Sequence, residues 1–198
     1  MIRIVVVISA YIAAQLLSDI TSLKIVILFG LSMDAGTLIY PITFTLRDMV
    51  HKTIGLQATR ALIVCAAVIN LFMAGLFWLV AQLPSDLSVG PQSEFAVVLA
   101  PVWRIVFASI VAEVISELID TEVYRLWVKQ TAKYQWGRVL TSNAVSVPLD
   151  SLLFVSIAFI GTMPLTVVGS ILLANILVKG VTTLLSLPLI YVVPEREA

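Results

Sequence analysis

Charged residues and cysteine are scarce in this sequence. Charged side chains make up 12% of its 198 residues, and 12 basic side chains are balanced by 12 acidic ones. Because lysine and arginine are not in surplus, nucleic-acid binding is not expected. The single cysteine, Cys65, lies inside an apolar run. It excludes an intrachain disulfide, and we interpret it as a packing residue.

Motifs of catalysis and metal binding are also missing. The sequence contains no G-x-S-x-G, H-E-x-x-H or P-loop pattern. One histidine and one cysteine cannot supply a usual zinc site. The best case for an enzyme is the acidic stripe Glu113, Glu117 and Asp120, which lacks a nucleophile and a second cluster of ligands. We therefore expect neither enzyme activity nor a metal or other cofactor.

Apolar residues, by contrast, make up 60% of the chain, and its mean hydropathy is +1.07. These values indicate an integral membrane protein and not a soluble domain. A helix needs roughly 20 apolar residues to cross about 30 Å of hydrocarbon. The sequence therefore predicts an all-α membrane protein with one domain, residues 1–198, and a bundle of six transmembrane helices at about 4–17, 25–46, 61–83, 95–119, 144–163 and 165–193.

The basic residues between these spans predict the orientation of the chain. Lys24 lies on one side of the membrane, and all the others lie on the opposite side: Arg3, Arg47, Lys52, Arg60, Arg125, Lys129, Lys133, Arg138 and Arg196. Cytoplasmic loops are enriched in lysine and arginine. We therefore expect both termini to be cytoplasmic, in a multi-pass protein of the cell (inner) membrane that is embedded in the lipid bilayer.

Four ionisable residues interrupt the apolar spans near their middle: Asp34, Arg104, Asp150 and Lys179. Each would cost at least about 2.5 kcal/mol if it were alone in hydrocarbon. They should therefore pair with one another, or contact a polar ligand or a water-filled cavity. The alternative to a functional site is a set of structural ion pairs that hold the helices together.

Polar residues at helical spacing accompany these charges. Asn143 and Ser146 share a helix face with Asp150, and Asn175 shares one with Lys179. Lipid offers such stripes no hydrogen-bond partners, so they should face a cavity or other helices. Near the cytoplasmic side, Glu113, Glu117 and Asp48 are candidates for ion coupling or gating.

The second span is unusual because Gly30, Gly36 and Pro41 lie within 12 residues. Interrupted helices of this kind expose backbone groups to the solute in transporters. We predict a broken or kinked helix beside the cavity. The alternative is an ordinary proline kink with close glycine packing.

Three groups of residues carry a resemblance to a known family, and together they cover most of residues 24–160. They are Lys24-Ile25-Val26, Leu28-Phe29-Gly30, Ala35-Gly36-Thr37-Leu38-Ile39-Tyr40-Pro41-Ile42-Thr43-Phe44, Asp48 and Gly55; then Arg104, Ala108-Ser109, Ser116 and Asp120; then Trp136, Arg138, Ser142, Ser146, Asp150 and Phe154. In order and spacing they resemble the queuosine precursor transporters, also called the vitamin uptake (VUT) family.

This resemblance implies a six-helix bundle similar to the substrate-binding subunits of energy-coupling-factor transporters. It also implies uptake of a 7-deazaguanine precursor of queuosine, a tRNA modification: 7-cyano-7-deazaguanine, 7-aminomethyl-7-deazaguanine or queuine. The chain departs from the family's pattern where Lys52, Val139, Asn143 and Val147 replace its usual polar or acidic residues. These departures bear on the exact ligand more than on the transporter class.

A deazaguanine presents N1–H and a 2-amino group, which a buried carboxylate can accept with two hydrogen bonds. Asp150 is the first candidate for this role, and aromatic rings would stack on the ligand. The remaining candidates for binding are Arg104, Asn143, Ser146, Asn175, Lys179, Asp34, Tyr40 and Phe44.

Three alternatives stay open for partners and function. The chain can act alone or as a homo-oligomer, or it can bind another vitamin-like solute for a separate ATPase module. It can also be a membrane scaffold, which predicts direct Asp34–Lys179 and Arg104–Asp150 contacts in a dry interior.

Overall fold

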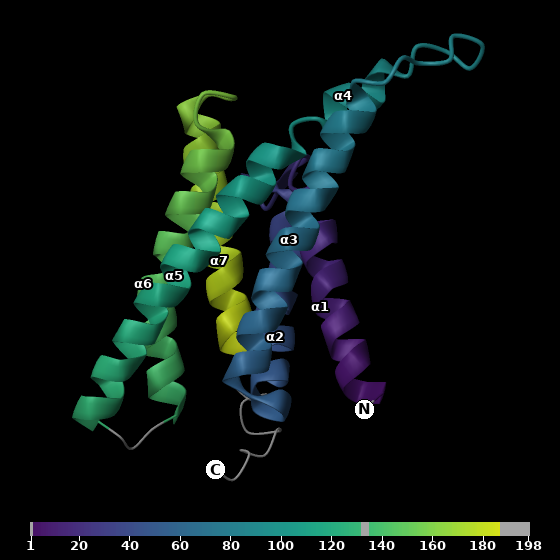
Figure 1. Cartoon of the computed structure of the whole chain (residues 1–198). Helices are drawn as coiled ribbons and strands as arrows, with labels where there is room; N and C mark the ends of the chain where they lie inside the picture. The colour runs from purple at the N-terminus through teal and green to yellow at the C-terminus, as the bar shows by residue number, and fades with distance from the viewer. Residues whose placement is uncertain (1, 132–134, 187–198) are drawn as a thin grey trace.

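The computed structural model is a bundle of helices with one short β-hairpin, and it describes residues 2–131 and 135–186 (Figure 1). Within these ranges, the side chains of residues 2, 3, 44, 45, 48, 51–53, 56, 117, 118, 120–131, 135–139, 142 and 186 are not described. The elements are α1 (Ile2–Thr21), β1 (Ile25–Leu28), β2 (Leu31–Asp34), the 3-10 helix η1 (Ala35–Leu38), α2 (Tyr40–Ile54), α3 (Leu56–Ala81), α4 (Ser93–Leu99), α5 (Val102–Thr131), α6 (Gln135–Phe159) and α7 (Leu165–Ser186).

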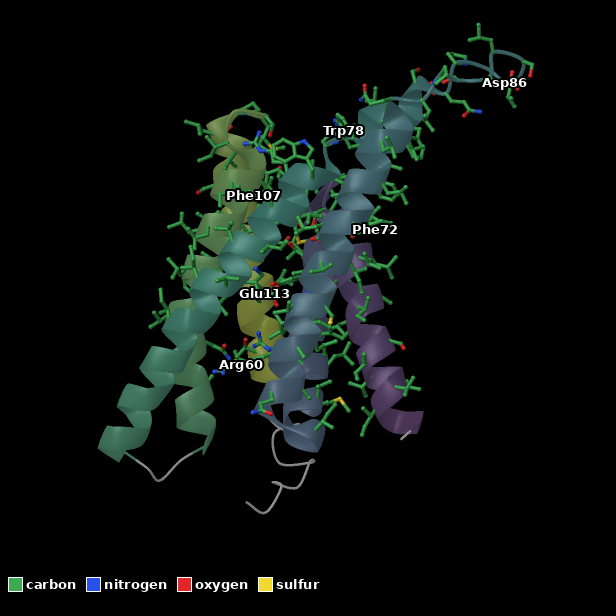
Figure 2. All side chains as sticks on the ribbon, in the orientation of Figure 1. Arg60, Phe72, Trp78, Asp86, Phe107 and Glu113 are labelled. Atoms are coloured by element: carbon green, nitrogen blue, oxygen red, sulfur yellow. The ribbon has the colours of Figure 1, made fainter. Side chains whose placement is uncertain are left out.

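Within residues 2–131 and 135–186, four helical segments are long and apolar enough to cross a membrane: Ile4–Thr21, Gln57–Ala81, Ser93–Ser116 and Leu165–Leu185. The apolar part of α6, Asn143–Phe159, is shorter. Large apolar side chains point outward, among them Phe72, Trp78 and Phe107 (Figure 2). A surface of this kind suits contact with lipid. The mostly helical membrane class is thus confirmed, while the number of six spans stays a prediction.

The predicted second span, 25–46, is interrupted as expected, but its first part is not helical, which corrects the prediction of a broken or kinked helix over the whole segment. Its first part is the antiparallel hairpin β1–β2, in which Ile25 is opposite Asp34. The β-branched run at Ile25 favours a strand. Phe29 and Gly30 make the turn with φ of 51° and 80°, the positive values that a two-residue hairpin loop of type I′ requires.

The rest of that segment is η1 followed by α2. Pro41 lies in the first turn of α2, where its missing N–H costs no helical hydrogen bond. The predicted interruption therefore exists, but it is a change from strand to 3-10 helix to α-helix and not a proline kink within one helix.

Two other boundaries differ from the predicted ones. The first helix was predicted to end at residue 17, but it extends to Thr21. The fourth span is divided at Ala100 and Pro101 into α4 and α5, because proline lacks the N–H that would continue the helix. Residues 82–92 form an irregular connection between α3 and α4.

The ends of the described helices fit the predicted orientation. The start of α1, the start of α3 and the end of α5 lie at one end of the molecule, and the loop 82–92 lies at the other (Figure 1). Arg60 is near the first end and Asp86 is at the second (Figure 2). The cytoplasmic location of both termini stays a prediction.

The apolar core that positions the site lies where α5, α6 and α7 meet. Its members include Ile105 and Ala112 of α5, Phe154 and Val155 of α6, and Ile171 of α7. Packing of these side chains holds the polar faces of α5, α6 and α7 toward one another.

Candidate functional site

A polar hollow lies between α1, η1, α2, α5, α6 and α7. It is formed by the inward faces of these elements, each of which contributes at least one polar or aromatic side chain. The lining residues are Ser18, Ser22, Asp34, Thr37, Tyr40, Ser109, Ala112, Asp150, Phe154, Asn175 and Lys179. Five of the nine residues predicted for binding are therefore brought together here.

Asp34 organises one wall of the hollow. Its side chain is buried and caps η1: Oδ1 accepts hydrogen bonds from the Thr37 backbone N–H at 3.1 Å and from Ser22 Oγ at 2.9 Å. Oδ2 accepts from Thr37 Oγ1 and from Asn175 Nδ2, both at 2.8 Å. Two donors on each oxygen fill the capacity of the carboxylate.

Asn175 connects α7 to the same wall. Besides its bond to Asp34, its Nδ2 donates to the Ile171 carbonyl at 3.1 Å. Its Oδ1 lies 3.0 Å from Thr37 Oγ1, whose single proton can go either to this oxygen or to the nearer carboxylate of Asp34. A second link lies outside the hollow, where the Ser32 N–H donates to Ser170 Oγ at 2.8 Å. Hydrogen bonds between residues far apart in the sequence thus hold the hairpin and η1 against α7.

Asp150 and Lys179 form an ion pair across the hollow. Lys179 Nζ lies 2.5 Å from Asp150 Oδ2, and the two side chains are only 3% and 6% exposed. Ser116 Oγ donates to Asp150 Oδ1 at 3.3 Å. Lys179 Nζ also lies 4.8 Å from the centre of the Tyr40 ring, close enough for a cation–π interaction.

These contacts differ from the ones that the scaffold alternative predicts. Lys179 pairs with Asp150 and not with Asp34. Arg104 donates instead to the carbonyls of Ile157 and Ile160, at 2.7 and 2.5 Å. Those carbonyls belong to the end of α6, where the helix has no further N–H to offer them and its dipole favours a cation. Arg104 does not line the hollow.

The other predicted residues lie around this site or outside the described side chains. Ser146 is buried and Asn143 half-buried on α6, and neither lines the hollow. Glu113 accepts a hydrogen bond from Tyr11 Oη at 3.3 Å. The side chains of Phe44, Asp48 and Glu117 are outside the described set.

Sequence reasoning missed Asp19, which is 2% exposed in the last turns of α1. Its Oδ1 accepts a hydrogen bond from Ser109 Oγ at 2.9 Å, and its Oδ2 has no partner in the structure. A signal was present: Gln15, Ser18 and Ser22 stand at i, i+3 and i+7, a helical stripe like those of the later spans. Placing the end of the first helix at residue 17 concealed it.

The hollow is narrow. About 300 Å³ of it is not filled by atoms, counted with its opening to the outside, but the centre of a water molecule can reach only about 20 Å³. A cavity that holds one water molecule has about 10–15 Å³ that the centre of that molecule can reach. The space therefore suits about one water molecule, and a two-ring ligand can enter only if lining side chains move apart.

Comparison with known proteins identifies the family. The model of the family described as "Putative vitamin uptake transporter" matches residues 34–193. The chain belongs to the vitamin uptake transporter family. The "Probable queuosine precursor transporter" of Bacillus subtilis (strain 168) is 26% identical over 184 residues, which cover 90% of this chain and 79% of the relative. No solved structure matches the chain.

Membership of the vitamin uptake transporter family confirms the resemblance found in the sequence. The family and the relative's name indicate a membrane transporter of a small molecule, not an enzyme. Among the described residues, no group of three or more His, Cys, Asp and Glu could hold a metal ion. The hydrogen-bonding groups of the hollow are accordingly the place to look for solute recognition.

Proposed function

We propose that this protein takes up a 7-deazaguanine precursor of queuosine and holds it in the hollow between η1 and helices α5–α7. The candidate solutes are 7-cyano-7-deazaguanine, 7-aminomethyl-7-deazaguanine and queuine. Support comes from the family match, from the name of the Bacillus subtilis relative, and from a buried polar hollow in a chain built of apolar helices.

The proposal depends on how many hydrogen bonds each of the two acids at the hollow already accepts. Asp34 already accepts four hydrogen bonds from neutral groups. Asp150 accepts one from Lys179 and at most one from Ser116, whose single proton can instead go to the Glu113 carbonyl at 3.1 Å. At least two of its roughly four acceptor positions therefore remain for a ligand. Asp150 is therefore the acceptor for N1–H and the 2-amino group, and Asp34 holds Thr37 and Asn175 in place.

Other lining residues complete the proposed site. Lys179 has three N–H donors, and its one hydrogen bond is to Asp150, so another can reach the ring carbonyl of the solute. Tyr40 and Phe154 line the same hollow and present aromatic faces for stacking on a flat ring. Arg104 acts at a distance, by holding the end of α6.

Asp150→Asn tests the proposal in cells that cannot synthesise the precursor. The amide offers one acceptor oxygen in place of two and no charge, so uptake should fall roughly 10- to 100-fold, the equivalent of about 1.5–3 kcal/mol for hydrogen bonds to a charged group. Uptake would be measured with labelled 7-cyano-7-deazaguanine and normalised to the amount of protein in the membrane.

The matched control is Glu94→Gln, the same loss of charge at an exposed position of α4. It should leave uptake unchanged. Wild-type cells that take up no more of the precursor than cells without the protein would show that the proposed solute is wrong. Unchanged uptake in Asp150→Asn at normal protein levels would contradict the role of Asp150.

A further inference from the structure

We propose that Asp19 is the proton-carrying residue of this transporter and that Ser109 transmits its protonation state to the solute hollow. The inference rests on the proposed function, because it concerns how uptake of the solute is driven. Among the side chains that the structure describes, three acids near the hollow are buried, Asp19, Asp34 and Asp150, and they differ in what surrounds them.

Asp34 is surrounded by four neutral donors, and Asp150 by a lysine and a serine. Asp19 accepts one hydrogen bond, from Ser109, and its Oδ2 is buried without a partner. An ionised carboxylate removed from water is costly unless donors or a cation compensate it. Asp19 is thus the acid whose charged form the protein supports least, and the one that gains most from a proton on Oδ2.

No charged side chain described in the structure compensates Asp19. Helix α1 packs against α2, η1, α3 and α5. The titratable or charged side chains described on these elements are Tyr40 and Arg47 on α2, Asp34 at the start of η1, Arg60 and Cys65 on α3, and Arg104 and Glu113 on α5. None of them forms a hydrogen bond or ion pair with Asp19.

Ser109 provides the connection to the solute because it belongs to both places. Its hydroxyl donates to Asp19 and its side chain lines the hollow. A hydroxyl has one proton to donate. While Asp19 is ionised, the Ser109 hydroxyl donates its proton to the carboxylate, and only its acceptor lone pairs are available to a solute in the hollow. Once Oδ2 of Asp19 is protonated and the neutral carboxyl group turns so that its O–H faces Ser109, that O–H can donate to the serine oxygen, and the serine proton can turn toward a solute.

The coupled cycle moves one proton with each solute. A proton from water on the outer side binds Oδ2 of Asp19, and solute binding to the protonated form is favoured by the additional donor from Ser109. After the hollow opens to the inner side, the solute leaves and the proton returns to water there. Because binding and protonation favour each other, the proton gradient drives solute inward.

Proteoliposomes that contain only the full chain, with tritiated 7-cyano-7-deazaguanine as the probe, test the inference. This probe is uncharged, so one proton per molecule allows a gradient of one pH unit, acid outside, to sustain roughly tenfold accumulation. Asp19→Asn should retain exchange of internal for external probe and lose accumulation. The control Asp86→Asn, in the exposed loop 82–92, should retain both. Ser109→Ala should reduce the effect of the pH gradient.

Three results would overturn the inference: accumulation by Asp19→Asn, accumulation by the wild type with neither a pH gradient nor a membrane potential, or accumulation driven by sodium at equal pH and zero membrane potential. Infrared difference spectra recorded during a pH change provide a readout that needs no solute. The carbonyl band of a protonated carboxylic acid should be lost in Asp19→Asn and kept in Asp86→Asn. If the wild type moves no probe, the proposed solute is wrong, and the infrared comparison decides the role of Asp19 on its own.

Discussion

Lys179 and Asp150 lie on neighbouring helices, and each neutralises a charge that neither water nor lipid could stabilise at that place. Removal of one partner leaves the other buried and uncompensated, which is far more destabilising than removal of both. The pair therefore has a structural role in addition to the proposed role in binding, and the two roles can be separated by experiment.

Lys179→Met should lower the free energy of unfolding by about 3–5 kcal/mol, because Asp150 loses its cation. The double variant Lys179→Met with Asp150→Leu should regain most of this stability, since no isolated charge remains, and should still fail to take up the solute. Thermal unfolding in detergent measures the first effect, and cell uptake measures the second. Equal stability of the single variant and the wild type would contradict the structural role.

At this scale the sequence predicted that Asp34, Asp150 and Lys179 lie in the interior, and they are buried. It did not predict which of them pair. Asp34 and Lys179 were as plausible a pair as Asp150 and Lys179 from depth alone. The choice depends on the direction in which each helix turns its polar face. Asp34 turned out to be satisfied by Ser22, Thr37 and Asn175, and so it needs no cation.

At the scale of single elements, the backbones of η1 and α1 approach each other closely at Gly36. Gly36 lies against Ser18 and Ser22: Ser18 Oγ donates to the Gly36 carbonyl at 3.1 Å. A Cβ at position 36 would collide with Ser22 Oγ and with the Ser18 carbonyl oxygen, and the second of these is backbone that cannot turn away. Glycine is required here for space, not for an unusual φ.

Gly36→Ala should therefore destabilise the protein by about 1–3 kcal/mol or more, the usual cost of overpacking. It should also displace Asp34 and reduce uptake. Gly75→Ala in α3 is the matched control, because a Cβ there meets no atom within 4 Å and alanine favours a helix. Thermal unfolding of both variants in detergent checks this expectation, and a Gly36→Ala protein as stable as Gly75→Ala would refute it.

Errors in the predicted ends of helices determined which buried residues the sequence analysis overlooked. The end of α1 continues past residue 17, and this extension buries Asp19 next to Ser109 of α5. The first part of the predicted span 25–46 is a hairpin and not a helix. Its β-branched residues favour a strand and its two-residue turn favours a hairpin, and these local preferences outweigh the apolar composition that suggested a span.

At the scale of the whole molecule, the ends of the bundle can be assigned to the two sides of the membrane by experiment. The distribution of lysine and arginine predicts that the loop 82–92 faces outward and that the start of α3 faces the cytoplasm. Ser88 lies in that loop, and Gln57, at the start of α3, is exposed.

In a Cys65→Ser background, a membrane-impermeant maleimide applied to intact cells should label Ser88→Cys and not Gln57→Cys. Gln57→Cys should be labelled only after the membrane is made permeable. The extent of labelling would be read from the shift in electrophoretic mobility of the protein. The reverse pattern would show that the chain is inserted in the opposite orientation.

The narrow hollow also has a consequence for the molecule as a whole. Since it admits about one water molecule, loading and release of a larger solute require the helices around it to separate. The contacts that would have to change are those between η1, α1 and α7, which depend on Asp34, Thr37 and Asn175.

The sequence alone determined that this chain has the composition of a membrane protein, that ionisable residues interrupt its apolar stretches, and that it resembles a family of transporters. Hydropathy and helical spacing carry that information because they depend on one helix at a time. Only the tertiary structure decided that Lys179 pairs with Asp150, that Arg104 binds the end of α6, and that Asp19 is buried. These outcomes depend on how neighbouring elements are rotated and where they end, and those positions are set by packing between segments far apart in the chain.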